Sequence, residues 1–277
     1  MIKMSEVDEL ANEIYSRYGT VKRARGNFLY TAKGVRLTDL FLEGGRAILG
    51  WGNEGTGAFL IFKNVLNRGV SGSFITDFNV RSQNSKKTRL SKAFSELLNS
   101  ERLTLVFNSK EEALKTALFF SADSTSVYRP WNSTDTVWQD IDCVVVAPPL
   151  SWACNLWVLA VKEDVVPFFD ESMNFKNIKL PAPFEAAIVR SVYDLIKALP
   201  VRQEKNWFIY DKVLTKYFIR KGPYLFPKVP AEKYADFVKH CLECELVISP
   251  IYSNPSIVPF GADFGVFRKL EKSPFEL

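Results

Sequence analysis

The chain has little histidine or cysteine: one His and four Cys in 277 residues. The single His240 leaves a Ser-His or Cys-His hydrolase only one possible base, and no nucleophile motif lies near it, which argues against that class. Cys143, Cys154, Cys241 and Cys244 lack the spacing of a secreted disulfide scaffold and predict reduced thiols. Cys241 and Cys244 form a Cys-x-x-Cys step beside His240, but no second ligand pair with zinc spacing follows. We therefore favour packed thiols over a metal site.

Long apolar runs are also missing. No run reaches the roughly 18 residues that span a bilayer, and no charged-then-apolar leader opens the sequence, so we expect a cytoplasmic protein without membrane contact. A glycine-rich phosphate loop of the Walker or Rossmann type is absent too. The excess of 36 basic over 31 acidic residues gives only +5. The basic stretches at residues 22–25 and 86–92 predict a solvated face or a helix start, not a nucleic-acid surface, because no series of aromatic residues accompanies either.

The hydrophobic content of 47% suits one large domain or two modest ones with a real core. Apolar periodicity and turn residues predict an order of mixed helices and strands. Helices are expected at residues 6–18, 57–67, 86–98, 109–120, 183–198, 204–219, 231–244 and near the end of the sequence, with a loop at 71–85. Strands are expected at residues 27–30, 35–41, 103–107, 143–147, 155–161, 224–229, 246–249 and 257–260.

Three motifs occur in an order typical of one enzyme family. Residues 26–53, GNFLYTAKGVRLTDLFLEGGRAILGWGN, contain glycine, Leu-Tyr, Lys-Gly, Leu-x-Asp and Leu-Gly at fixed positions. Residues 108–113 read Asn-Ser-Lys-Glu-Glu-Ala between an expected strand and helix. Residues 142–162 form two apolar runs, broken by prolines, that begin at Asp142 and reach Ala147 before the break.

These motifs resemble those of the class III aminotransferases, fold-type I enzymes that use pyridoxal phosphate. The resemblance covers most of the chain outside residues 121–140, where complete members carry several further strands and the Asp that pairs with the cofactor's ring nitrogen. It implies an α/β fold: a truncated fold-type I PLP-transferase-like architecture, with a reduced large domain around a mixed sheet and a small α+β C-terminal domain. The implied division is residues 1–54 for an N-terminal helix and hairpin segment packing with the small domain, 55–189 for the reduced large domain, and 190–277 for the small domain.

The chain departs from the family at the residues that hold the cofactor. Pro148 occupies the position of the lysine that bonds the cofactor, and proline has no amine for a Schiff base. In the phosphate turn Asn108, Ser109, Lys110, Glu111, the family's glycine and threonine have become Lys110 and Glu111. Carboxylates there repel a phosphate, so we expect pyridoxal phosphate to be lost and no catalytic residue to remain. Lys110 and Lys162 are interpreted as surface lysines, though either amine could replace the missing one.

Four further residues form a candidate residual cleft: Tyr30, Arg46, Trp51 and Trp152. Trp51 replaces a family histidine, as Asn53 does, and Glu54 replaces a proline. Arg46 could bind a carboxylate with two hydrogen bonds, but we favour the interpretation as a surface arginine or one that braces the hairpin. Trp152 stands in the turn after the lysine position. It either fills part of the cofactor cavity or lies at a subunit contact.

These observations leave two main functional hypotheses. The first is a non-catalytic aminotransferase-like protein that acts as a binding, scaffolding or regulatory subunit. The alternative is an enzyme, either an aminotransferase that uses pyridoxal phosphate with an unusual lysine or another small-molecule enzyme that uses the residual cleft. The resemblance implies a homodimer or association with an active relative, and loss of part of the sheet leaves an edge for a partner to cover.

Overall fold

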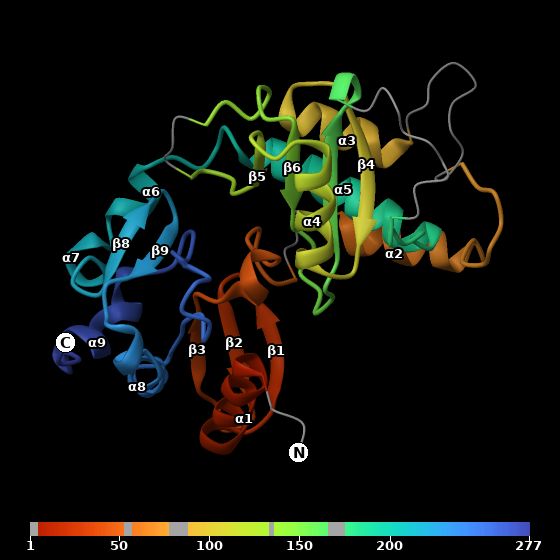
Figure 1. Cartoon of the computed structure of the whole chain (residues 1–277). Coiled ribbons are helices and arrows are strands. Elements are labelled where there is room, and N and C mark those ends of the chain that lie inside the picture. The colour runs from red at the N-terminus through yellow and green to blue at the C-terminus, as the bar shows by residue number, and fades with distance from the viewer. Residues whose placement is uncertain (1–4, 53–56, 78–87, 133–135, 166–174) are drawn as a thin grey trace. The chain divides into compact units, whose positions relative to one another are not determined.

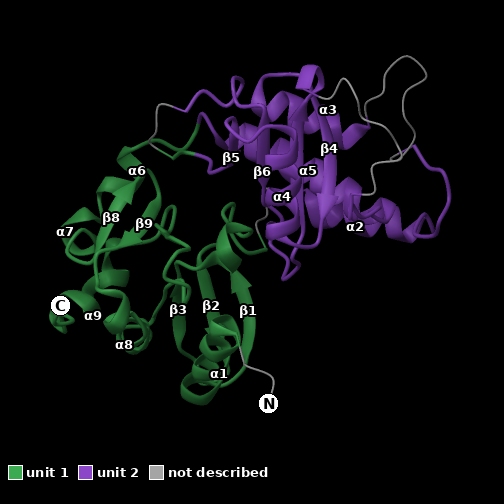
Figure 2. Ribbon diagram, viewed as in Figure 1, with its two compact units in different colours: residues 1–53, 131–134, 201–277 green, residues 54–130, 135–200 purple. Residues whose placement is uncertain are grey.

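The computed structural model describes residues 5–52, 57–77, 88–132, 136–165 and 175–277 (Figure 1). The chain divides into two compact units, coloured separately in Figure 2. Unit 1 comprises residues 1–53, 131–134 and 201–277, and unit 2 comprises residues 54–130 and 135–200. Unit 1 therefore combines the two end segments of the chain with residues 131–134, whereas unit 2 is built from the middle of the chain.

Unit 1 opens with a helix whose limits follow from its capping residues. Helix α1 (Glu6–Tyr18) begins after Ser5, whose hydroxyl accepts a hydrogen bond from the Asp8 amide at 3.2 Å. The Asp8 carboxylate accepts in return from the Ser5 amide at 3.3 Å, so two amides at the helix start are satisfied reciprocally. Gly19, with φ of 76°, ends the helix in a conformation that favours glycine. The helix predicted at residues 6–18 is confirmed.

A four-stranded sheet links the beginning of the chain to its final third. Its order is β1-β2-β3-β10, and β10 lies parallel to β3 while the other pairs are antiparallel. The strands are β1 (Val21–Arg25), β2 (Phe28–Thr31), β3 (Arg36–Asp39) and β10 (Leu246–Val247). Buried Leu10, Ile14 and Leu37 form one core with Leu242 and Val247, so the N-terminal segment and the C-terminal third fold together. For residues 22–25 the predicted solvated surface is confirmed, but the alternative of a helix start is wrong, since they belong to β1.

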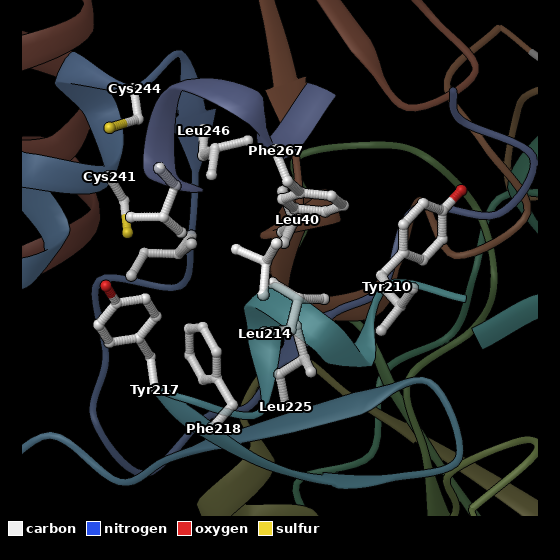
Figure 3. Close-up of a cluster of buried hydrophobic side chains, with 14 of the residues drawn as sticks. Leu40, Tyr210, Leu214, Tyr217, Phe218, Leu225, Cys241, Cys244, Leu246 and Phe267 are labelled. Atoms are coloured by element: carbon white, nitrogen blue, oxygen red, sulfur yellow. The ribbon is translucent and has the colours of Figure 1, made fainter. Parts of the chain in front are cut away.

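The remainder of unit 1 surrounds a second core. Its three-stranded antiparallel sheet has the order β11-β9-β8. The elements are α6 (Lys205–Phe208), α7 (Asp211–Leu214), β8 (Phe218–Lys221), β9 (Tyr224–Pro227), α8 (Ala231–Glu243), β11 (Ser256–Ile257), η3 (Phe264–Phe267) and α9 (Arg268–Lys272). Figure 3 shows Leu40, from just after β3, among Leu214, Phe218, Leu225 and Phe267. This core again contains side chains from both ends of the chain.

The single helix predicted at residues 204–219 is wrong. The structure has two short helices there, and β8 begins at Phe218. The Arg220 guanidinium binds both carboxylate oxygens of Asp211, at 2.6 and 2.9 Å, and so holds β8 back against α7. The apolar residues follow a helical spacing, but Phe218–Lys221 pair with β9 in the sheet and so cannot continue a helix.

Unit 2 is a mixed sheet with helices on both faces. The sheet order is β4-β7-β6-β5; β5 is parallel to β6, and the other pairs are antiparallel. The elements are α2 (Ala58–Asn67), α3 (Arg89–Leu98), β4 (Arg102–Phe107), α4 (Lys110–Phe120), β5 (Thr125–Val127), β6 (Cys143–Val146), β7 (Trp157–Lys162), η2 (Glu163–Val165) and α5 (Ala182–Ala198). Ala113 and Ala117 of α4 pack on one face of the sheet. On the other face, the Ser91 hydroxyl of α3 bonds the Thr104 hydroxyl at 2.9 Å.

A buried arginine holds the segment that leads into β6. The Arg102 side chain is fully buried, and its guanidinium donates to the carbonyl oxygens of Ile141 at 2.6 Å, Asp142 at 2.8 Å and Trp138 at 3.0 Å. Its Nε donates to the Ser100 hydroxyl at 2.7 Å. Because β4 and β6 are not neighbours in the sheet, Arg102 fixes where the chain enters the central strand.

We expect Arg102→Met to lower the free energy of unfolding by at least about 3 kcal/mol, because several buried carbonyl groups would each lose a donor worth about 1–3 kcal/mol. Urea unfolding followed by circular dichroism measures this change. Lys92→Met on the exposed side of α3 is the matched control and should stay within about 0.5 kcal/mol of the parent. Equal midpoints for the two variants would contradict the role of Arg102.

Candidate functional site

The turn between β4 and α4 is closed by the chain's own side chains. The Ser109 hydroxyl accepts a hydrogen bond from the Glu112 amide at 3.3 Å and donates to the Glu111 carboxylate at 2.7 Å. That hydrogen bond is the main cause that holds the pKa of Glu111 below its usual value. The first turn of α4 therefore carries an ionised carboxylate where its free amides would otherwise attract an anion.

Lys110 is the amine at this turn. It is half-buried, and its Nζ lies 5.5 Å from the ring centroid of Trp157 on β7. Burial, and then the positive charge of Arg129, lower the pKa of Lys110. The interpretation of Lys110 as a plain surface lysine is therefore wrong, and its amine loses its proton more readily than a solvated lysine.

Pro148 and Lys162 lie towards opposite ends of β6. Pro148 is buried just beyond the C-terminal end of the strand. Lys162 ends the antiparallel neighbour β7, and its Nζ lies 3.3 Å from the carboxylate of Asp142, which precedes β6. The Lys162 side chain is only 21% exposed, so it too is no plain surface lysine. Its ion pair holds it away from the position of Pro148.

Trp152 belongs to an aromatic cluster in unit 2. Its ring centroid lies 5.0 Å from Phe184 of α5, 5.3 Å from Phe62 and 5.9 Å from Phe59 of α2. These distances are typical of favourable aromatic pairs. The indole thus joins the turn after β6 to two helices, and its role in filling a cofactor cavity stays a prediction.

The other three residues of the candidate cleft belong to unit 1. Tyr30 of β2 lies under the Arg23 guanidinium, 4.3 Å from its ring centroid. Arg46 is buried, so the interpretation as a surface arginine is wrong. The Trp51 indole donates to the Asp39 carboxylate at 2.7 Å. Trp152 belongs to unit 2, whereas the other three residues belong to unit 1. A cleft formed by all four residues therefore stays a prediction.

Asp39 is a structural centre that the sequence reasoning missed. Besides Trp51, its carboxylate accepts the amides of Phe41 and Leu42, both at 2.9 Å. The chain then turns through four successive residues of positive φ, two of them non-glycine: Leu42 at 48°, Glu43 at 52°, Gly44 at 66° and Gly45 at 95°. Three hydrogen bonds to one buried carboxylate support this costly turn. The Leu-x-Asp motif before a Gly-Gly pair was the available signal.

The His240 and cysteine group is packed. Cys241 and Cys244 are buried, and the His240 Nε2 lies 2.8 Å from the Ser273 carbonyl oxygen. Burial raises the pKa of Cys241 well above its usual value. Within the described part of the chain no group of three or more His, Cys, Asp or Glu residues could hold a metal ion, and no helix is long and apolar enough to cross a membrane.

Comparison of the sequence with known proteins finds two relatives that match most of the chain. No protein-family model matches the chain. It is 26% identical to an uncharacterized protein of Treponema pallidum, over 89% of this chain and 91% of that protein. It is 24% identical to an uncharacterized protein of Borreliella burgdorferi, over 93% of this chain and 90% of that one.

Among solved structures the chain is similar to aminotransferases along nearly its whole length. The ornithine aminotransferase of Plasmodium yoelii matches with a TM-score of 0.60 and 12% identity, over 97% of each chain. That of Toxoplasma gondii matches with a TM-score of 0.64 and 10% identity, over 98% of this chain and 97% of that one. The acetylornithine aminotransferase of Elizabethkingia anophelis matches with a TM-score of 0.60 and 11% identity, over 97% and 98%. The chain thus has an aminotransferase-like fold, the PLP-transferase architecture at a reduced size, as its motif order predicted.

Two positions of this chain, the turn at the start of α4 and Pro148, correspond by the motif resemblance to the family's phosphate turn and lysine. The residues at both positions do not fit pyridoxal phosphate. A phosphate at the start of α4 would face the Glu111 carboxylate, which already occupies the Ser109 hydroxyl. The buried Pro148 supplies no amine beyond β6. The donor set that a Schiff base and a phosphate group require is therefore missing from these two positions.

Asp39 should make stability depend on pH. Burial raises its pKa from 3.8 to about 6, so between these values the folded state holds a proton that the unfolded state has lost. Stability should therefore fall as pH rises from about 4 to about 6, by about 3 kcal/mol relative to Asp39→Asn, which cannot ionise. Urea unfolding of both proteins across this range measures the difference. A constant difference between them would contradict the burial of an ionisable Asp39.

Proposed function

We propose that this protein is a non-catalytic relative of the aminotransferases that acts as a binding, scaffolding or regulatory subunit. The observation that carries the proposal is the hydrogen bond between Ser109 and Glu111 at the start of α4. It places a negative charge on the helix terminus that would have to attract a phosphate group.

Changes at a second position support the same conclusion. Pro148 removes the amine, and Lys162 is held by Asp142 at the other end of β6. The replacements at the turn before α4 and at Pro148 both remove groups that pyridoxal phosphate would need. Glu111 is held by a hydrogen bond from Ser109, and Pro148 is buried. Such settled contacts are expected where selection has retained the fold without the cofactor chemistry.

Lys110 favours a second candidate, an enzyme that forms an imine with an aldehyde such as pyridoxal phosphate. Its lowered pKa increases the fraction of free amine, which is the nucleophilic form. The Glu111 carboxylate beside it opposes an anionic aldehyde. We place this candidate second for that reason.

Titration with pyridoxal phosphate separates the two candidates. We expect no new absorbance band near the visible edge and, after borohydride reduction, no adduct on one defined lysine by intact mass and peptide mapping. Lys110→Arg, which keeps the charge but removes the amine, is the matched variant. An adduct in the parent protein that maps to Lys110 and disappears in Lys110→Arg would establish the second candidate instead.

The protein is also proposed to form a homodimer, with pairing to an active relative as the alternative. Unit 2 carries large apolar side chains with high exposure, including Leu60 at 62%, Leu118 at 52% and Phe119 at 64%. Among the described residues of unit 2, the sheet ends at β5, a strand of only three residues. Exposed apolar side chains and an open sheet edge are features that association covers.

Size-exclusion chromatography with light scattering at micromolar concentration should give twice the mass of the 31.5 kDa chain. Leu118→Asp should shift the mass towards the monomer if α4 lies in the interface, whereas Lys115→Asp, on the same helix, serves as the polar control. A monomer mass for the parent protein throughout the micromolar range would contradict the homodimer.

A further inference from the structure

Unit 1 contains a groove between two helices that come from opposite ends of the chain, α1 and α8. It has a volume of about 210 Å³. The residues of α1 that line it include Glu6, Glu9 and Glu13, and those of α8 include Ala231, Ala235 and Val238. On both helices these residues recur at intervals of three and four, so each helix presents one face to the groove. We call it the α1–α8 groove.

The floor of the α1–α8 groove is apolar. Leu10 of α1 and Leu242 of α8 line it and are buried in one core, and Val238 packs against that core while staying partly exposed. Ala231 and Ala235 are exposed, and their small side chains leave room above the floor for another chain to approach. The groove therefore offers apolar surface that the described part of the chain does not cover.

A pair of tyrosines adds aromatic surface to the α1–α8 groove. Tyr234 and Tyr252 both line it, and their ring centroids lie 5.1 Å apart in an edge-to-face arrangement. The hydroxyl of Tyr234 donates to the Ser249 carbonyl oxygen at 2.7 Å, and that of Tyr252 donates to the Val229 carbonyl oxygen at 3.3 Å. The hydroxyl groups are thus satisfied within the chain, and Tyr252, which is 41% exposed, leaves its ring available to a basic side chain.

The rim of the α1–α8 groove is mainly acidic. Its three glutamates are exposed or half-buried, and Lys239 is the only basic residue among the described residues that line the groove. Arg17 binds Glu13 at 2.9 Å, but it also binds the carboxylate of a second glutamate at 3.1 Å, so its single charge is shared. Within the described residues no ion pair holds Glu6 or Glu9. An acidic rim beside an apolar floor is complementary to a chain that carries apolar and basic side chains together.

We propose that the α1–α8 groove binds a basic amphipathic helix of a partner protein, with the apolar face of that helix on the floor and its lysines or arginines against the glutamates of α1. Helices that pack together place side chains spaced by three and four into each other's grooves, and the lining residues have this spacing. From Ala231 to Leu242 the groove follows α8 for roughly 16 Å, at a rise of about 1.5 Å per residue. About three turns of a partner helix therefore match its length.

This inference supplies a partner for the proposed binding role and rests on that role, but it uses a different part of the molecule. The groove belongs to unit 1 and shares no residue with the turn before α4 or with Pro148, which belong to unit 2. An adduct on Lys110 would overturn the proposed function without affecting the groove. Failure of a basic helix to bind would overturn the groove without affecting the outcome with pyridoxal phosphate.

Fluorescence anisotropy with a labelled synthetic peptide tests the groove on the full chain. The probe is a peptide of about 14 residues, built of leucine and lysine so that the leucines lie on one face of a helix. We expect saturable binding at one site, weakened as the salt concentration rises. A peptide of the same composition in scrambled order, and one with glutamate in place of lysine, should each bind at least about tenfold more weakly. Equal binding of the scrambled peptide would overturn the proposal.

Charge variants test the acidic rim. The double variant Glu6→Gln, Glu9→Gln should weaken peptide binding about three- to tenfold, because two exposed ion pairs are lost. Lys239→Gln should strengthen it, because the variant removes a like charge beside the peptide. The matched control is Glu232→Gln with Asp236→Asn, two exposed carboxylates of α8 outside the groove, and it should bind as the parent does. An equal loss in this control would overturn the proposal, since binding would then follow overall charge.

Two tryptophan variants test the floor. Ala235→Trp fills the groove and should weaken peptide binding at least about tenfold. Ala11→Trp, at an exposed alanine of α1 outside the groove, is the matched control and should bind as the parent does. Equal affinities for the two variants would overturn the proposal. So would an absence of peptide binding combined with a dimer mass that only Ala235→Trp abolishes, because the groove would then hold a second copy of the chain. Unchanged urea midpoints ensure that folded proteins are compared.

Discussion

The structure of unit 2 depends on the antiparallel pairing of β6 with β7. All four residues of β6 are fully buried, so the strand is held by neighbours on both edges and by side chains on both faces. This pairing fixes Asp142 and Lys162 beside each other at one end of the strand and leaves Pro148 beyond the other. Arg102 then secures the entry into β6 through main-chain carbonyl groups. The relative positions of Asp142, Lys162 and Pro148 are therefore consequences of one strand pair.

Unit 1 depends on a different constraint, the joining of the two ends of the chain. β10 completes the N-terminal sheet, and Leu40 lies in a core made mostly by the last third of the chain. Asp39, the last residue of β3, lies at this junction, shortly before the turn of positive φ. A buried carboxylate with three donors is costly to ionise but specific in geometry, and it determines how the chain leaves the hairpin.

The changes at the cofactor positions are compatible with a stable protein. Glu111 is a favourable residue for the first turn of a helix, and Pro148 follows a strand where its missing amide breaks no ladder bond. The fold is therefore retained although the residues at these two positions differ from those of the family that the motifs resemble.

Much of the fold could be predicted from the sequence, because its signals are local. Capping residues set α1, apolar runs set β4, β6 and β7, and the order of three motifs indicated the aminotransferase-like architecture that the solved structures show. The helix expected at residues 204–219 failed because residues 218–221 pair with β9, a partner strand that the local apolar spacing does not reveal.

At the candidate site, the sequence by itself determined which groups are missing: an amine at Pro148 and a small residue at Lys110. Only the tertiary structure decided what the remaining groups do. It paired Lys162 with Asp142, and it buried the Asp39 carboxylate with the Trp51 indole as a hydrogen-bond donor. The physical reason is that charge and hydrogen bonding act over a few ångströms in space, between residues that the chain order keeps far apart.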